Sequence, residues 1–211
     1  MIDPGVPAGP SEAIILADET ANPDLAALDL IIESEHGPDS SAFLVTPSRR
    51  VADGAIAALS RYWQDMETER AQFSKTVLGG AHGGIVLTRD FEAAVEFTNA
   101  YAPEHLQILC AEPMAVMGCI RNAGEILLGA YSPCTLGNYL LGPNAVLPTG
   151  GRAKTASPLS VLDYMKRTSV AQVTREGYAR VAADAHRLAL YEGFDGHARA
   201  VSSLRTALLS D

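Results

Sequence analysis

No apolar run in the sequence approaches the roughly 18 residues that a membrane-spanning helix needs. The first ten residues, MIDPGVPAGP, also lack the charged segment followed by an apolar segment that marks a secretory signal. These two absences predict a soluble, cytoplasmic protein with no membrane partner.

Basic charge is scarce as well. The 211 residues include 16 Lys and Arg against 25 Asp and Glu, which gives a formal net charge of −9. No basic run could neutralise several phosphates, which argues against a nucleic-acid partner.

Cysteine is rare and does not occur in a metal-binding or redox spacing. The three cysteines, Cys110, Cys119 and Cys134, form no CxxC motif, and their odd number disfavours a disulfide framework. A reducing compartment fits this usage. We expect Cys110 and Cys119 to lie in the core.

The sequence also has no GxGxxG or P-loop motif that would cradle a nucleotide. It has instead an alternation of short β-rich runs and longer helical patterns over residues 1–130, which predicts an α/β domain with a parallel or mixed sheet and flanking helices. The predicted strands are 13–17, 42–46, 84–88, 105–109 and 125–129, and the predicted helices are 22–36, 48–74, 90–101 and 113–121.

The alternation ends near residue 130. Residues 131–156 are rich in Gly, Pro, Ser, Thr and Asn but keep several apolar side chains, which is typical of a functional loop. We expect an active-site loop there and a helical tail over 157–211, with helices at 174–192 and 196–209 separated at Gly193.

Two pairs of residues could carry chemistry. Glu33 and His36 are three apart within the predicted helix 22–36, so they could share a metal ion; alternatively, Glu33 is solvated and His36 interacts with the helix end. Glu104 and His105 lie where a loop enters a predicted strand, a position that suits acid/base work if the loop geometry lets both reach one substrate. A structural role is the alternative for that pair. His82, His186 and His197 are interpreted from spacing as structural or surface residues.

Several blocks occur together and in order: VPAGPSEAIILADETANP, EHGPDS, YAPEHLQI, NAGEILLG, NAVLPTGG, LSVLDYMKRTSV and EGFDGH. Together they resemble the C-terminal half of histidinol dehydrogenase over essentially the whole chain. The resemblance implies a zinc-dependent homodimer that oxidises L-histidinol through the aldehyde to L-histidine with two NAD. It further implies that His105 removes protons from the alcohol and from the aldehyde hydrate, and that Glu104 activates the attacking water.

The resemblance also implies a ligand set. Family enzymes hold zinc with a glutamine and a histidine in Q-x-x-H, an aspartate in a G-D-Y loop and a histidine near the C-terminus, where this chain has Glu33, His36, Asn138 and His197. Glutamine has become a carboxylate and aspartate an amide, so the set keeps its charge and remains suited to Zn²⁺.

Substrate contacts are implied by the same resemblance. Ser11 and Glu192 match substrate-binding positions, and the four zinc positions and His105 are expected to face the substrate as well. In the family the tail crosses to the partner subunit, so Glu192 and His197 are expected to complete the other chain's site.

Three departures from the family bear on function. Ala145 replaces a histidine associated with substrate binding, and Cys134 replaces a glutamate, which leaves a related amino alcohol or hydroxymethyl compound as an alternative to L-histidinol. The portion that contacts NAD in the family precedes GPSE, and we expect it to be absent from this chain. The main alternative to an enzyme is therefore a non-catalytic remnant or assembly module, and a metallohydrolase that uses Glu104 is a third class.

Overall fold

The structure is a computed structural model that describes residues 5–6 and 8–208. The chain divides into two compact units, Met1–Tyr164 and Met165–Asp211. The first contains the sheet, and the second contains the last three helices. Residue 209, the predicted end of the last helix, and residues 1–4 and 7 of the N-terminal pattern lie outside the described residues. The division at residues 130 and 156 stays a prediction.

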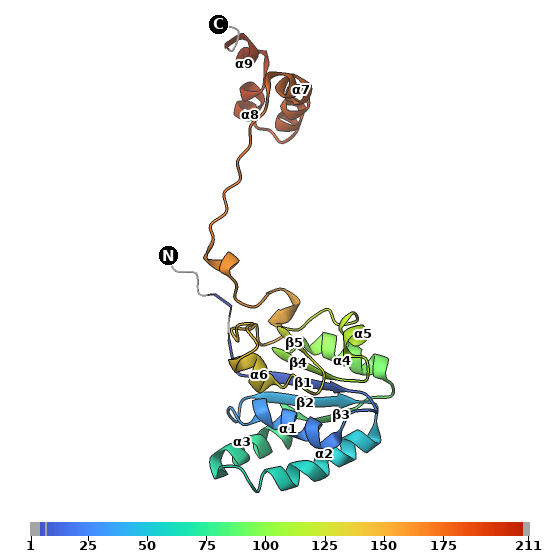
Figure 1. Cartoon of the computed structure of the whole chain (residues 1–211). Coiled ribbons are helices and arrows are strands. Elements are labelled where there is room, and N and C mark those ends of the chain that lie inside the picture. The colour runs from blue at the N-terminus through green and yellow to red at the C-terminus, as the bar shows by residue number, and fades with distance from the viewer. Residues whose placement is uncertain (1–4, 7, 209–211) are drawn as a thin grey trace. The chain divides into compact units, whose positions relative to one another are not determined.

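The first unit is an α/β structure around an entirely parallel five-stranded sheet, as the alternating pattern predicted (Figure 1). The strand order is β3-β2-β1-β4-β5. The strands are β1 (Glu12–Ala17), β2 (Ser41–Thr46), β3 (Gly83–Leu87), β4 (His105–Leu109) and β5 (Glu125–Leu128).

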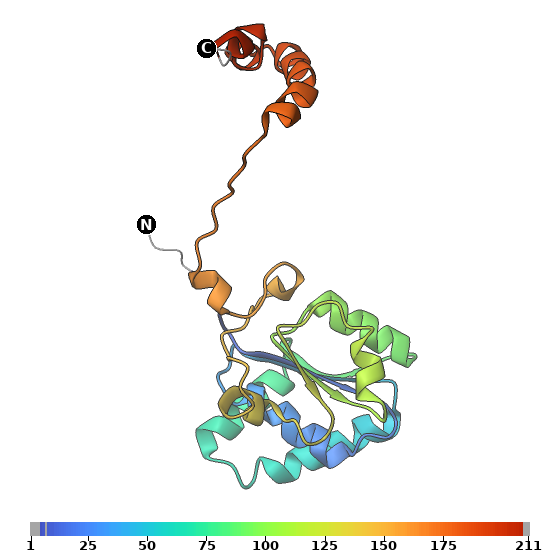
Figure 2. The same cartoon turned by 45° about the horizontal axis from the view of Figure 1, so that its top comes forward.

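Helices of the first unit cover both faces of this sheet (Figures 1 and 2). In the first unit they are α1 (Pro23–Ser34), α2 (Arg49–Tyr62), α3 (Thr68–Leu78), α4 (Phe91–Tyr101), α5 (Pro113–Met117) and α6 (Cys134–Tyr139), with short 3-10 helices at Arg152–Lys154 and Val161–Tyr164. In the second unit they are α7 (Arg175–Tyr191), α8 (Asp195–Ala200) and α9 (Ser203–Leu208).

Strand alternation separates two cores. Ile15 and Leu44 face α1, α2 and α3, whereas Ile14, Leu16 and Leu106 face the side of α4. All five side chains are fully buried. Apolar burial on both faces explains why these strands read as nearly continuous apolar runs rather than alternating ones.

The caps of two helices agree with the sequence. Asn22 precedes Pro23, the first residue of α1, and its side chain accepts a hydrogen bond from the Asp24 N–H. The Asp90 carboxylate accepts the Ala93 N–H at 2.7 Å at the start of α4. Both satisfy amide donors that the first helical turn leaves unpaired.

Four predicted helices have other bounds in the structure. The predicted helix 113–121 ends at Met117, as α5. The predicted helix 48–74 is two helices, because Glu67 caps a new helix by accepting the N–H groups of Glu69 and Arg70. The predicted helix 196–209 is likewise broken into α8 and α9. Helix α1 ends at Ser34, so His36 lies beyond it rather than on its surface.

The expected core position of Cys119 was also wrong, since Cys119 is exposed, whereas Cys110 is half-buried and Cys134 is buried. No helix in the described part of the chain has both the length and the apolar character to cross a membrane.

A buried chain of hydrogen bonds fixes the end of α1 against α3. Ser34 Oγ donates to the Ile31 carbonyl at 3.0 Å, which leaves it to accept the Ser74 hydroxyl at 2.8 Å. Ser74 in turn accepts Trp63 Nε1–H at 2.9 Å. Both serines are fully buried. The Ser74 hydroxyl thus connects the end of α1, through Ser34, with the turn after α2, through Trp63.

Replacing Ser74 with alanine is expected to lower the free energy of unfolding by about 1–3 kcal/mol, because Trp63 Nε1–H loses its acceptor in a partly buried place. Urea unfolding checks this. Ser60→Ala on the exposed side of α2 is the matched control and is expected to change stability by no more than about 0.5 kcal/mol. Equal stabilities of the two variants would contradict this account of the Ser74 bonds.

Candidate active site at the amino edge of the sheet

Polar residues gather where the parallel strands begin, and His105, which the sequence indicated, is one of them. Glu12, Ser41, His105 and Glu125 are the first residues of β1, β2, β4 and β5. We call this side the amino edge. Ligands in open parallel sheets usually bind at the opposite, carboxyl ends of the strands, so this location departs from the common pattern.

Three carboxylates surround the His105 imidazole. Its Nδ1 lies 3.2 Å from Glu125 Oε2, and its Nε2 lies 3.9 Å from both Glu33 Oε1 and Glu104 Oε1. The side chain of His105 is 4% exposed and that of Glu33 is 1% exposed. Burial lowers the pKa of His105, but the hydrogen bond to Glu125 and the charges of Glu33 and Glu104 raise it by more, so the net pKa lies above its ordinary value.

The loop before β4 lets Glu104 and His105 act on the same place, although neighbours in a strand point to opposite faces. Ala102 ends α4 with φ 61° and ψ 64°, a left-handed conformation uncommon for alanine, and the strand begins only at His105. The Glu104 and His105 side chains consequently approach within 3.9 Å.

Glu12 links this loop to two neighbouring segments. Its backbone N–H donates to Glu104 Oε2 at 2.9 Å, and its own Oε1 accepts the Gly150 N–H at 2.9 Å. Burial raises the pKa of the Glu104 carboxyl, while the Glu12 N–H and the charge of His105 oppose the rise. Burial likewise raises the pKa of Glu12.

The predicted zinc positions of the first unit converge on Glu33. His36 Nδ1 lies 3.3 Å from Glu33 Oε2, and Asn138 Nδ2 lies 3.5 Å from Glu33 Oε1. His36 Nδ1 also lies 2.9 Å from the Ile32 carbonyl, which can only accept. A neutral His36 ring therefore carries its proton on Nδ1 and leaves Nε2 free to bind a ligand.

These residues fit a divalent cation better than they fit one another. Glu33 is buried with its nearest nitrogen partners at 3.3 Å (His36 Nδ1) and 3.5 Å (Asn138 Nδ2). Asn138 Oδ1 is buried with no hydrogen-bond partner among the described residues, so this oxygen is left for a cation. No three His, Cys, Asp or Glu side chains of the described chain are arranged to hold a metal by themselves. The implied set differs because it includes the Asn138 amide and a histidine of the second unit.

Buried polar groups continue inward from Glu33. Asp29 is one turn earlier on α1, and Gln107 follows His105 on the same face of β4. Burial raises the pKa of Asp29 to about 6, and the Gln107 amide opposes the rise. Burial, followed by the charges of Glu33, Asp29 and Glu125, raises the pKa of Cys134 well above its ordinary value, so its thiol stays protonated.

Ser11 lies at the amino edge, directly before β1. Its carbonyl accepts the Ser41 N–H at 2.8 Å, which brings the starts of β1 and β2 together. A cavity of about 300 Å³ opens beside it, lined by residues that include Glu12, Ser41, His82 and Tyr101. This volume is at the lower end of small-molecule pockets.

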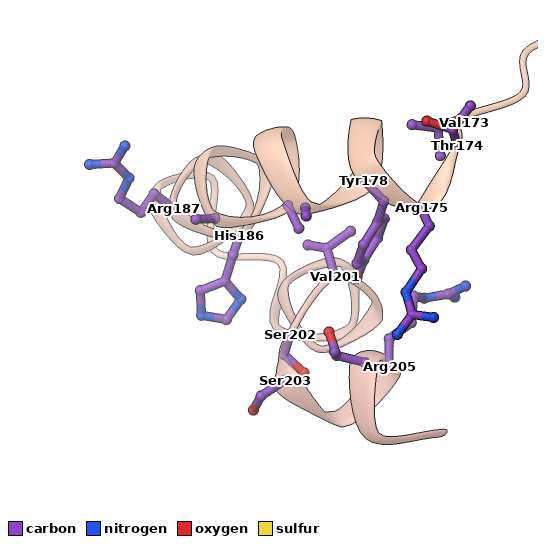
Figure 3. A pocket seen from close by; sticks show the side chains of 14 residues that line it. Val173, Thr174, Arg175, Tyr178, His186, Arg187, Val201, Ser202, Ser203 and Arg205 are labelled. Atoms are coloured by element: carbon purple, nitrogen blue, oxygen red, sulfur yellow. The ribbon is translucent and has the colours of Figure 1, made fainter. Parts of the chain in front are cut away.

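Glu192 and His197 belong to the second unit. Glu192 caps the end of α7, and His197 lies in α8 against the Phe194 ring, with centroids 5.2 Å apart. A cavity of about 1130 Å³ in this unit is lined by α7, α9 and the turn after α8, including Tyr178, His186 and Arg205 (Figure 3). It contains neither Glu192 nor His197.

Sequence reasoning missed Glu125 and Glu12. Both are carboxylates at the first position of an apolar strand, and His105 has the same position in β4. Because parallel strands begin at one edge, this shared position was a usable signal.

Comparisons with known proteins agree with one another. A protein-family model described as histidinol dehydrogenase matches residues 1–205. A "Histidinol dehydrogenase homolog" of Colwellia psychrerythraea is 62% identical over 97% of this chain and 46% of its own length, and a "Histidinol dehydrogenase" of Synechocystis is 51% identical over 95% and 46%. The crystal structure of histidinol dehydrogenase from Elizabethkingia anophelis superposes with a TM-score of 0.89 at 30% identity, covering 98% of this chain and 46% of that one. The chain thus spans about half the length of the relatives it matches.

Replacing Asp29 with asparagine is expected to stabilise the protein above pH 6. The folded pKa of about 6 exceeds the ordinary 3.8, so the folded state binds more protons between these values and stability falls as pH rises through them. A shift of this size corresponds to at most about 3 kcal/mol above pH 6.

Urea unfolding of wild type and Asp29→Asn at pH 5 and pH 8 measures this, with exposed Asp65→Asn as the control. The Asp29 variant is expected to gain more stability at pH 8 than at pH 5. An equal gain at both pH values would show that the Asp29 carboxyl is not perturbed by burial.

Proposed function

The chain belongs to the histidinol dehydrogenase family, and we propose that it forms the metal- and substrate-binding half of a zinc- and NAD-dependent alcohol dehydrogenase. The reaction converts a hydroxymethyl group through an aldehyde to a carboxylate. The observation that carries this proposal is the convergence of Glu104, His105 and Glu33 within 3.9 Å contacts at one buried edge.

His105 acts as the base. Its Nδ1 is engaged by Glu125, so Nε2 is the nitrogen that accepts the proton of the substrate hydroxyl and later that of the aldehyde hydrate. Glu104 accepts a proton from the water that attacks the aldehyde. Burial raises the pKa of its carboxyl, which makes Glu104 a better proton acceptor than an exposed carboxylate.

Glu33, His36 and Asn138 hold Zn²⁺ in this proposal, with His197 as the fourth ligand. A bound ion would supply Lewis-acid polarisation of the substrate. NAD would supply the hydride acceptor, and the resemblance implies that a portion of the family enzymes outside the match would hold it.

The substrate is L-histidinol or a related amino alcohol or hydroxymethyl compound. Ser11 contacts it at the amino edge, and Glu192 binds it from the second unit of a partner chain in a homodimer. Ala145 and Cys134 replace family residues in the predicted active-site loop 131–156. In this proposal these two positions decide between the substrates.

The alternative is an assembly module without turnover. It is favoured by the altered metal-ligand positions, where Glu33 and Asn138 stand in place of the glutamine and the aspartate of the family.

An activity assay distinguishes the dehydrogenase from the assembly module. The chain is to be fused to the amino-terminal half of the Colwellia psychrerythraea relative, and NADH formation is to be followed with L-histidinol and with small amino alcohols. Glu104→Gln and His105→Gln are each expected to lower kcat by about 10²–10⁴, because each removes a proton acceptor.

Glu92→Gln on the exposed surface of α4 is the control and is expected to keep the parent rate. A fusion without activity on any of these alcohols, or unchanged rates in both site variants, would favour the assembly module.

A further inference from the structure

One carboxylate of the amino edge, Glu125, contacts the proposed base but takes up no proton in the proposed reaction. Glu125 pairs directly with His105 in the β4–β5 register, so their side chains lie on the same face of the sheet. The Glu125 and His105 side chains are 8% and 4% exposed, and Oε2 and Nδ1 are 3.2 Å apart. The contact is therefore set by the backbone and shielded from water.

The backbone holds this pair closely on one side. The Glu125 N–H donates to the Glu104 carbonyl at 2.8 Å, next to the catalytic loop. Gly124 permits this approach, since a Cβ there would lie 2.6 Å from the same carbonyl oxygen. The start of β5 is thus fixed relative to Glu104 and His105.

Helix α6 closes the other side. A Cβ on Gly137 would lie 2.8 Å from Glu125 Oε2 and 3.1 Å from Oε1, so a larger residue there would require the carboxylate to shift. Cys134 on the same helix is fully buried among the charges of Glu33, Asp29 and Glu125, and its protonated thiol adds no further charge. The Glu125 carboxylate has little room to leave His105.

We infer that Glu125 is a positioning residue that holds the His105 ring with its proton on Nδ1 and its Nε2 lone pair directed toward Glu33 and Glu104. A carboxylate can only accept a hydrogen bond, so the 3.2 Å contact requires a proton on Nδ1. With the ring proton on Nδ1, the other ring nitrogen, Nε2, is unprotonated and is the one that can act as a base.

This inference rests on the proposed role of His105 as the base. It differs from a purely structural role for Glu125, in which loss of the carboxylate would change stability but not the position of the ring proton.

The test is long-range ¹H–¹⁵N correlation NMR of the chain with ¹⁵N-labelled histidine, at a pH where the His105 ring is neutral. His105→Gln assigns the signals among the five histidines. Wild type is expected to show the Nδ1–H form in excess by at least about tenfold, because a hydrogen bond to a charged group favours it.

Glu125→Ala is expected to reverse this ratio toward the Nε2–H form, and Glu125→Gln to reduce the excess, since an amide oxygen accepts more weakly than a carboxylate. Glu104→Gln is the matched control: it removes a charge on the Nε2 side and is expected to keep the Nδ1–H form. Circular dichroism establishes that each variant is folded.

An excess of Nε2–H in the wild type would overturn the inference, and this result does not depend on any variant folding. The same ratio in wild type and folded Glu125→Ala or Glu125→Gln would also overturn it. The NMR measurement needs neither turnover nor metal. If the fusion protein is inactive but the wild-type chain shows His105 in the Nδ1–H form, the result counts against the proposed function and not against this inference.

Discussion

The burial of negative charge around one imidazole is the constraint on which the first unit depends. Glu33, Glu104 and Glu125 surround His105, and all four side chains are less than a tenth exposed. Burying an isolated carboxylate costs far more than most single contacts return, so such groups need a cation, a proton or hydrogen-bond donors. The structure supplies the Glu12 N–H to Glu104 and the His105 ring to Glu125, whereas the partners of Glu33 are His36 Nδ1 at 3.3 Å and the Asn138 amide at 3.5 Å. Both distances are longer than an ordinary hydrogen bond to a carboxylate, which is the physical reason to expect a divalent cation at Glu33.

The fold that creates this cluster was largely predictable. Five apolar runs became five parallel strands, because burial on both faces demands runs such as AIILA, and Asn22 and Asp90 capped their helices as expected. The errors involve side-chain bonds that periodicity does not reveal. Glu67 starts a new helix with its own side chain, and Ser34, the last residue of α1, bonds the hydroxyl of Ser74, 40 residues later. His36 consequently reaches Glu33 from beyond the helix, and its bond to the Ile32 carbonyl is the helix-end interaction that competed with the metal interpretation.

The site residues were predictable only where they are adjacent in the sequence or match a functional position of the family. The sequence indicated Glu104 and His105, but their 3.9 Å approach depends on the left-handed Ala102, an unusual conformation for a residue with a side chain. The pairing of Glu33 with Asn138, 105 residues apart, followed from the resemblance and not from spacing, and the structure brings them within 3.5 Å. Glu125 was missed because its contact with His105 comes from the register of β4 and β5, which a single strand pattern does not specify. Metal ligation by Glu33, His36, Asn138 and His197 stays a prediction.

Zinc affinity tests most directly whether the carboxylate cluster holds a cation. The metal-free chain is titrated with Zn²⁺ in competition with a chromophoric chelator, alongside Glu33→Ala and the matched variant Glu35→Ala, which removes a carboxylate two residues away. The account predicts that wild type and Glu35→Ala bind about one Zn²⁺ with similar affinity and that Glu33→Ala binds at least about tenfold more weakly. A wild-type chain that binds no zinc, or a folded Glu33→Ala variant that binds as tightly as wild type, would contradict it.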